Sequence, residues 1–398
     1  MADQAHRSLM LSLLPYSLIK LYYFNILNMN NSKNEIHSIA FLRGVACLFV
    51  ALYHLKSSAP SDSIFYNLFR FGAFGVDLFF MISGFVIVIA TMNDKKSDSF
   101  FIKRVFRIYP PLIAAVLLQV FISKSGVSFN ELMSAIVPLH NDYTAKAPDF
   151  GFSFLIVAWS ITFELAFYAL FMVSMIISHR YRALICSSLI LAIVIGTQLY
   201  YNGSFSLTQA GASPEINNSN LSFIRVFGCS IMIEFIFGMA IAYVYMNIKV
   251  DTSSLLARRV YTILSVLALM YLIPCYLGGY NRGSGLAGYG TWALLILFIA
   301  LGAEKLNMFR WNKSMLFVGA ISYSLYLFHI PVHELIKQII PDKLSQIKNI
   351  EIRAVCVMML ELSASMLVAY LSFLFIEKPC IKVARNFVYN RKIVSSLG

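Results

Sequence analysis

The sequence predicts an all-α, polytopic integral membrane protein with about ten transmembrane helices. Hydrophobic residues make up 59% of the 398 residues and charged residues only 13%, whereas a soluble domain carries about 25% charged residues. The mean hydropathy is +0.72. A chain of this length has so much apolar surface only where its exterior faces lipid rather than water.

Each predicted span is a stretch of roughly 20 mainly apolar residues, the length that crosses a bilayer as a helix. No internal repeat is evident in the sequence. The ten spans cover approximately residues 37–57, 72–92, 105–123, 154–177, 183–201, 226–247, 260–277, 288–302, 315–336 and 354–376.

The spans divide the chain into three regions. Residues 37–385 form the membrane domain, and 386–398 form a basic tail. Residues 1–36 are an N-terminal extension whose apolar part is interrupted by Pro15 and Lys20 and lacks an Ala-x-Ala cleavage site. This extension is either an interfacial helix or an artefact of start-codon choice.

The formal net charge is +13, from 32 Lys and Arg against 19 Asp and Glu. These basic residues fall between apolar stretches instead of forming a patch on a soluble fold, which argues against a nucleic-acid partner. They gather in alternate loops, so the positive-inside rule predicts a multi-pass protein with both termini in the cytoplasm. The loop containing Lys337 and Arg353 is an exception to this pattern.

Arg43 and His54 both lie within the first predicted span. Ionisable residues inside a span are costly and usually functional. Eleven residues correspond to three helical turns plus about 20°, so the two side chains share one face and lie about 16 Å apart along the axis. The alternative is an arginine that snorkels to the inner surface and a histidine near the outer end.

Asp77 lies in the glycine-containing stretch GVDLFFMISGF, which indicates close helix packing against a polar partner. A structural ion pair is the alternative. Arg104 and Arg107 come at the start of the third span. Their guanidinium groups at a helix N-terminus suit a phosphate, although both are also compatible with a role as positive-inside anchors.

Ser160, Glu164 and Tyr168 are spaced by four residues and share a helix face. Glu164 is a candidate proton acceptor, arginine partner or ligand for sugar hydroxyls, and a purely structural role is the alternative. Tyr326 and His329 lie one turn apart in the ninth span, where a hydrogen-bonded core histidine is the simpler interpretation.

Several catalytic motifs are absent from the sequence. There is no GxSxG nucleophile elbow, P-loop, GxGxxG or HExxH. The six cysteines are scattered without CxxC spacing, so no metal site is predicted. Histidine and carboxylates remain as the candidate chemical groups.

Taken together, these segments resemble the acyltransferase 3 family of integral membrane acyltransferases. They occur in the family's order: Arg43 and His54 at Arg-x10-His spacing, GVDLFFMISGF from Gly75, RVFRIYP from Arg104, WSITFELAFY from Trp159, SYSLYLFHIP from Ser322, and Glu377-Lys378-Pro379. The resemblance implies a ten-span domain. Some relatives carry a further extracytoplasmic hydrolase-like domain, which we do not expect in this chain.

The resemblance also implies an activity. An acyl group, most often acetyl from acetyl-CoA or another acyl-CoA, would pass from the cytoplasm to a carbohydrate hydroxyl of O-antigen, exopolysaccharide or a lipid-linked sugar. His54 would act as a general base or carry the acyl group itself. Arg104 and Arg107 would hold the donor, and Arg43 would hold a coenzyme phosphate or stabilise the oxyanion. Glu164 would orient the acceptor or an arginine.

Two other classes of function remain open on the residues alone. Buried ionisable residues also mark proton-coupled transporters and flippases of glycan precursors. A glycosyltransferase that uses a lipid-linked sugar is a third reading. Transfer of labelled acetyl groups to a glycan, as opposed to uptake into liposomes, distinguishes the enzyme from the transporter.

Overall fold

The structure is a computed structural model that describes residues 36–123, 126–140, 142–207, 212–216, 221–339, 347 and 349–397. Side chains are described as far as residue 391. Apart from Ile36, the predicted N-terminal extension lies outside the described residues.

The described segments are helical, and they contain no strand. The helices run in the order α3 (His37–Leu55), η1 (Lys56–Ser58), α4 (Ile64–Phe69), α5 (Phe74–Ala90), α6 (Ser97–Ile122), α7 (Phe129–Ile136), η2 (Ile156–Ala158), α8 (Trp159–Ile177), α9 (Arg182–Asn202), α10 (Ile224–Phe227), η3 (Ser230–Met232), α11 (Ile233–Asn247), α12 (Leu255–Gly278), α13 (Tyr289–Lys305), α14 (Lys313–Ile339), α15 (Ile350–Ser372), η4 (Phe373–Glu377) and α16 (Lys378–Leu397).

The predicted all-α, polytopic architecture is confirmed. Within the described part of the chain, nine helices are long and apolar enough to cross a membrane. The remaining predicted span, 288–302, is also a helix, α13, whose 17 residues are at the short end of the range for a span.

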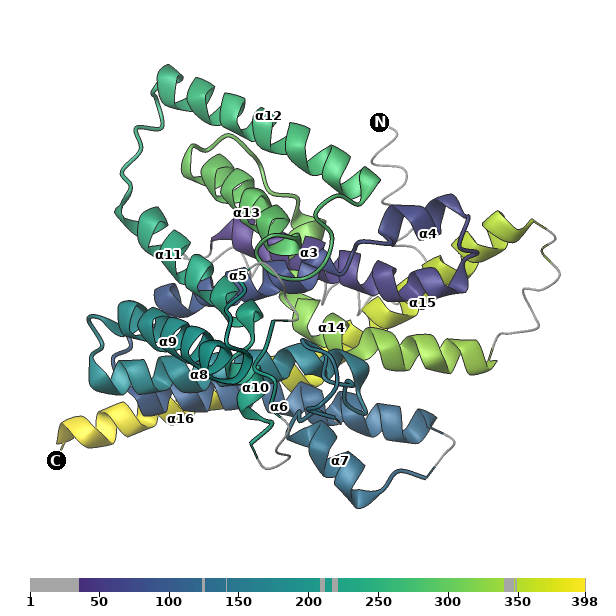
Figure 1. The fold of residues 1–398 in the computed structure, drawn as a ribbon, viewed down its shortest axis with the longest axis horizontal. Helices are drawn as coiled ribbons and strands as arrows, with labels where there is room; N and C mark the ends of the chain where they lie inside the picture. The colour runs from purple at the N-terminus through teal and green to yellow at the C-terminus, as the bar shows by residue number, and fades with distance from the viewer. Residues whose placement is uncertain are drawn as a thin grey trace.

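The bundle is built around α3 and α5, which lie near its centre (Figure 1). Helix α14 packs along α3 and α11 packs along α5. The α5–α11 crossing is close because glycines face backbone: a Cβ added at Gly84 would lie 2.2 Å from the carbonyl oxygen of Phe235, and one at Gly238 would lie 2.0 Å from that of Met81. Small residues at a crossing let two membrane helices approach closely.

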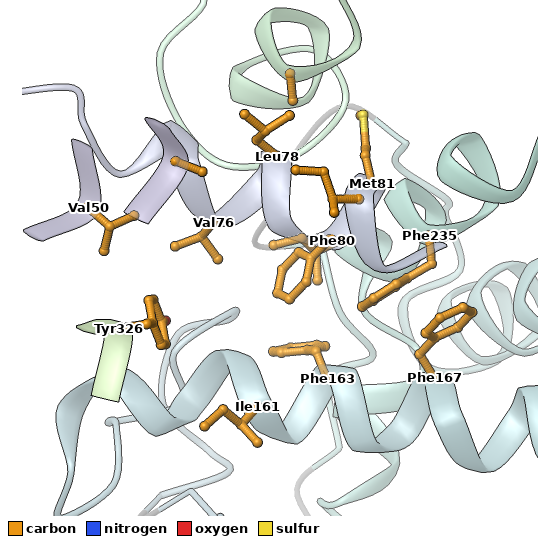
Figure 2. Packing of buried hydrophobic residues seen from close by; sticks show 14 of the residues in the cluster. Val50, Val76, Leu78, Phe80, Met81, Ile161, Phe163, Phe167, Phe235 and Tyr326 are labelled. Carbon is orange, nitrogen blue, oxygen red and sulfur yellow. The ribbon is translucent and has the colours of Figure 1, made fainter. Parts of the chain in front are cut away.

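The core beside this crossing is aromatic. The rings of Phe167 and Phe235 stack with centroids 4.2 Å apart, and Phe80 contacts both Phe163 and Phe235. Figure 2 shows these side chains filling the space between α5 and α8. At the edge of the bundle, α12 has only 17% of its apolar stretch buried inside the protein, as expected of a helix that faces lipid (Figure 1).

The N-terminus of α3 has no cap from its own N-cap residue, Ile36. Instead, the carboxylate of Glu304 on α13 accepts hydrogen bonds from the backbone N–H groups of His37 and Ser38, at 2.8 and 2.7 Å, and from the Ser38 hydroxyl. A carboxylate at this position satisfies free N–H groups and complements the helix dipole. This contact fixes the end of α3 that leads to Arg43.

The last predicted span, 354–376, is part of a longer helix. The helix runs without interruption from Ile350 through Glu377-Lys378-Pro379 to Arg391, and α16 takes in most of the predicted basic tail. Pro379 lacks an N–H group and would clash with the preceding turn of a regular helix. The widened π-helical turn η4 directly before it accommodates the proline without ending the helix.

Candidate active site

A cavity of about 90 Å³ opens between α3, α5, α6, α8 and α14. Seven of the ten predicted site residues line it: Arg43, Arg104, Arg107, Ser160, Glu164, Tyr168 and Tyr326.

Three arginines contribute positive charge to this cavity. Arg43 comes from α3, and Arg104 and Arg107 come from adjacent turns of α6. Among the described residues, no carboxylate lies within ion-pair distance of these guanidinium groups. The charge of Arg43 is balanced only at longer range by Glu377 and Glu164. The cavity therefore has the electrostatics of an anion site.

Glu164 is the cavity's carboxylate, and its position is fixed by neighbours. Its Oε1 accepts a hydrogen bond from the Ser83 hydroxyl at 3.1 Å and another from the Tyr168 hydroxyl, one helical turn away. Arg104 lies over the ring of Tyr168, 5.0 Å from its centroid. Glu164 and Tyr168, which were predicted to share a helix face, are thus in contact, and this network joins α5, α6 and α8.

A second set of contacts leads from the cavity to the histidines. The hydroxyls of Ser160 and Tyr326 are 2.7 Å apart. The Tyr326 ring lies 6.0 Å from the ring of His329, which in turn lies 5.2 Å from the ring of His54. Neither histidine lines the cavity itself.

The tautomer of His329 follows from its hydrogen bond. Its Nδ1 lies 3.1 Å from the carbonyl oxygen of Leu325, which can only accept, so Nδ1 carries the proton in the neutral ring. Its buried Nε2 has no hydrogen-bond partner among the described residues. His329 is completely buried, and its Nε2 is left as an acceptor on the side chain packed against His54.

Asp77 lies elsewhere. Its Oδ1 accepts a hydrogen bond from the backbone N–H of Gly285 at 2.7 Å. It is fully buried beside Glu234 of α11 and does not line the cavity. The close packing expected around it is present, since a Cβ added at Gly75 would lie 2.4 Å from the carbonyl oxygen of Ala46. Asp77 therefore holds the 279–288 loop against α5.

Sequence reasoning did not single out three polar residues of the cavity wall, Ser83, Ser322 and Tyr323. All three belong to segments that carry the family resemblance, but serine and tyrosine are common in membrane helices and give no signal of their own. Tyr323 also donates a hydrogen bond to the carbonyl oxygen of Ile108 at 2.9 Å, which ties α14 to α6.

In the described part of the chain, no group of three His, Cys, Asp or Glu side chains could hold a metal ion.

The fold and the cavity define a polytopic α-helical membrane protein with a polar site inside its bundle. The acyltransferase 3 model, described as an acyltransferase domain, matches residues 36–375. The chain therefore belongs to the acyltransferase 3 family, and it is an enzyme, an O-acyltransferase.

The chain is similar to three curated proteins over most of its length. It is 26% identical over 274 residues to the exopolysaccharide production protein ExoZ of Rhizobium meliloti (strain 1021), covering 66% of this chain and 76% of that protein. It is 28% identical over 312 residues to a protein of Acidianus two-tailed virus named as a candidate acetyltransferase, covering 76% and 85%.

The third relative is a Staphylococcus aureus (strain COL) protein named as a candidate O-acetyltransferase. The identity is 24% over 370 residues, covering 85% of this chain but only 56% of that protein. No solved structure is significantly similar to this chain.

Proposed function

We propose that this enzyme transfers an acetyl group, or another acyl group, from cytoplasmic acyl-CoA to a hydroxyl of a cell-surface polysaccharide or lipid-linked glycan. The observation that carries the proposal is the convergence of Arg43, Arg104 and Arg107 on one cavity without a carboxylate partner within ion-pair distance among the described residues. The name of the relative ExoZ, an exopolysaccharide production protein, supports a polysaccharide acceptor.

The arginines suit the donor because coenzyme A carries several phosphate groups. Guanidinium forks bind phosphate oxygens in pairs. Cytoplasmic acyl-CoA would enter from the side on which α6 begins at Ser97, and the loop charges predict that this side faces the cytoplasm along with both termini. Arg104 and Arg107 lie about two to three turns inside this helix, so the expected contribution of a helix N-terminus to phosphate binding is absent. In a bacterial cell this membrane would be the inner membrane.

His54 is the proposed catalytic group. A sugar hydroxyl is a weak nucleophile, and a positioned base accelerates its attack on a thioester by about 10²–10⁴-fold. His54 lies about 16 Å beyond Arg43 along α3. The long pantetheine arm of coenzyme A is suited to bridge such a separation between a phosphate site and an acyl-transfer site. His54 either takes the proton of the acceptor or carries the acyl group before transfer.

The test uses purified protein, radiolabelled acetyl-CoA and a glycan acceptor. Wild-type protein should place label on the glycan, and His54→Ala should not. The matched control is His37→Ala, which removes an exposed imidazole from the other end of the same helix. Uptake of glycan into liposomes without label transfer would instead identify a transporter. Transfer at the wild-type rate by His54→Ala would refute the role of the histidine.

A further inference from the structure

Three residues outside the cavity form a serine, histidine and carboxylate series. The Ser57 hydroxyl oxygen in η1 lies 3.2 Å from Nε2 of His333 on α14. Nδ1 of His333 lies 2.9 Å from Oε1 of Glu361 on α15. Ser57 is exposed, whereas His333 and Glu361 are only 6% and 0% exposed. This is the order of groups that activates a serine, recognised by geometry rather than by position in the sequence.

Two neighbours add to this arrangement. The Ser58 hydroxyl donates to both carboxylate oxygens of Glu361, at 3.0 and 3.1 Å, which fixes the carboxylate. The ammonium group of Lys337 lies 3.3 Å from the Ser57 hydroxyl oxygen and would favour an alkoxide there. The His333 ring N–H is not aligned with the Glu361 oxygen. Loose hydrogen bonds of this kind are common in free enzymes and tighten when substrate binds.

Ser57 is also next to the proposed catalytic histidine. Its hydroxyl donates a hydrogen bond to the backbone carbonyl oxygen of His54, three residues earlier, at 3.0 Å, so the hydroxyl must rotate toward Nε2 of His333 before that nitrogen can take its proton. On the facing helix, His333 follows His329 by one turn, and His329 packs against His54. The pairs His54–His329 and Ser57–His333 are therefore successive layers between the same two helices. Ser57 therefore lies one layer beyond His54, at the end of α3.

We infer that Ser57 is a second acyl-transfer station, which takes the acyl group and delivers it to the glycan as a serine ester. The inference rests on the proposed function. In the first step the Ser57 hydroxyl oxygen attacks the acyl carbon while Nε2 of His333 takes its proton. The bond between the acyl carbon and the donor sulfur breaks. If the acyl group has already moved to His54, the bond between the acyl carbon and the His54 nitrogen breaks instead. The thiolate or imidazole leaves with the electron pair and receives the proton from His333.

The second step reverses the roles. A glycan hydroxyl attacks the Ser57 ester, and Nε2 of His333 takes the hydroxyl proton. The bond between the acyl carbon and the Ser57 oxygen breaks, and His333 returns the proton to that oxygen. The enzyme is regenerated, and the only net change is transfer of the acyl group. The carboxylate of Glu361 stabilises the imidazolium that forms in each step.

The experiment combines two readouts on the purified full chain. A fluorophosphonate probe reports an activated serine without any acyl donor. Peptide mass spectrometry after a quenched reaction with acetyl-CoA reports an acetyl ester, which is stable at neutral pH and cleaved by hydroxylamine, whereas an acetyl-imidazole decays in water. Both signals should map to Ser57, and Ser57→Ala should remove them and lower glycan acetylation at least about 100-fold.

Ser61→Ala is the matched control, because it removes an exposed serine hydroxyl from the loop that follows η1. His333→Gln should lower probe labelling of Ser57 in protein that still binds acetyl-CoA. Wild-type acetylation by Ser57→Ala, or absence of probe and acetyl label on Ser57, would overturn the inference while leaving the proposed function intact. A different result, no acetylation of glycan by the wild-type protein, would refute the proposed function. Labelling of Ser57 by the probe needs no acyl donor and does not depend on that result.

Discussion

A single methyl group at Gly319 should disable the enzyme without touching a polar residue. A Cβ added there would lie 1.9 Å from the backbone carbonyl oxygen of Ala40 on α3. A backbone atom inside a helix cannot rotate away as a side chain can, so α3 and α14 must separate by about 1.5 Å to reach ordinary contact. One of these helices carries Arg43 and His54, and the other carries Tyr326 and His329.

The expected loss can be estimated from this displacement. A misplacement of about 1 Å between reacting groups costs about 100-fold in rate, and overpacking costs about 1–3 kcal/mol of stability. Gly319→Ala should therefore lower acetyl transfer by about 100-fold in membranes containing equal amounts of protein. It should also unfold at a lower temperature in detergent.

Gly196 provides the matched control for this substitution. It is also a helical glycine, in α9, but an added Cβ there would meet no neighbour within 4 Å. Gly196→Ala should be neutral or stabilise the protein by up to about 1 kcal/mol. The reasoning is refuted if Gly319→Ala transfers acetyl groups at the wild-type rate and unfolds at the wild-type temperature.

Three further predictions concern individual side chains. His54→Gln should be as inactive as His54→Ala in acetyl transfer, because glutamine can hydrogen-bond but cannot take the proton; substantial activity would contradict a proton-transfer role. Arg104→Ala and Arg107→Ala should weaken binding of coenzyme A in a direct binding assay more than binding of glycan, with only partial recovery in the lysine variants; unchanged donor affinity would identify them as topology anchors. In the 137–155 loop, burial among aromatic rings lowers the pKa of His140 to about 4. The folded state then binds fewer protons than the unfolded state, whose histidine has a pKa of about 6.5, so stability should fall by up to about 3 kcal/mol as the pH drops from about 6.5 to about 4. Thermal unfolding across this range should show a smaller loss for His140→Leu, and an equal loss would assign the effect to another group.

The helices were predictable because a membrane span is a property of a short local window. About 20 apolar residues suffice to place each one, and every predicted span coincides with a helix. The last span was predicted to end before Glu377-Lys378-Pro379, but the helix continues through this segment. The structure keeps the helix by widening one turn at Phe373–Glu377. Such a compensation depends on packing, here including the hydrogen bond from Ser324 to Glu377, and is not encoded in the proline itself.

The candidate site was predictable only in part, for the same reason. Residues on one helix could be related by periodicity, so the cluster of Ser160, Glu164 and Tyr168 on α8 was expected, and the structure places all three at the cavity. Contacts between helices distant in sequence could not be inferred in this way. Asp77 looked equivalent to the other polar residues of the spans, but it accepts a hydrogen bond from Gly285, 208 residues later in the chain, and does not line the cavity.

The group of Ser57, His333 and Glu361 shows most clearly what could not be predicted from the sequence. The absence of a GxSxG motif argued against a serine nucleophile. That argument covers only sites in which the serine lies in this one short sequence motif. Here the serine, the imidazole and the carboxylate come from η1, α14 and α15, and His333 is 276 residues from Ser57. Only the close α3–α14 crossing, made possible by Gly44 and Gly319, brings α14 near enough to the end of α3 for His333 to meet Ser57. Two glycines without any chemical group of their own therefore determine which side chains can act together. For this reason a methyl group at Gly319 should affect both the His54–His329 pair and the Ser57–His333 pair.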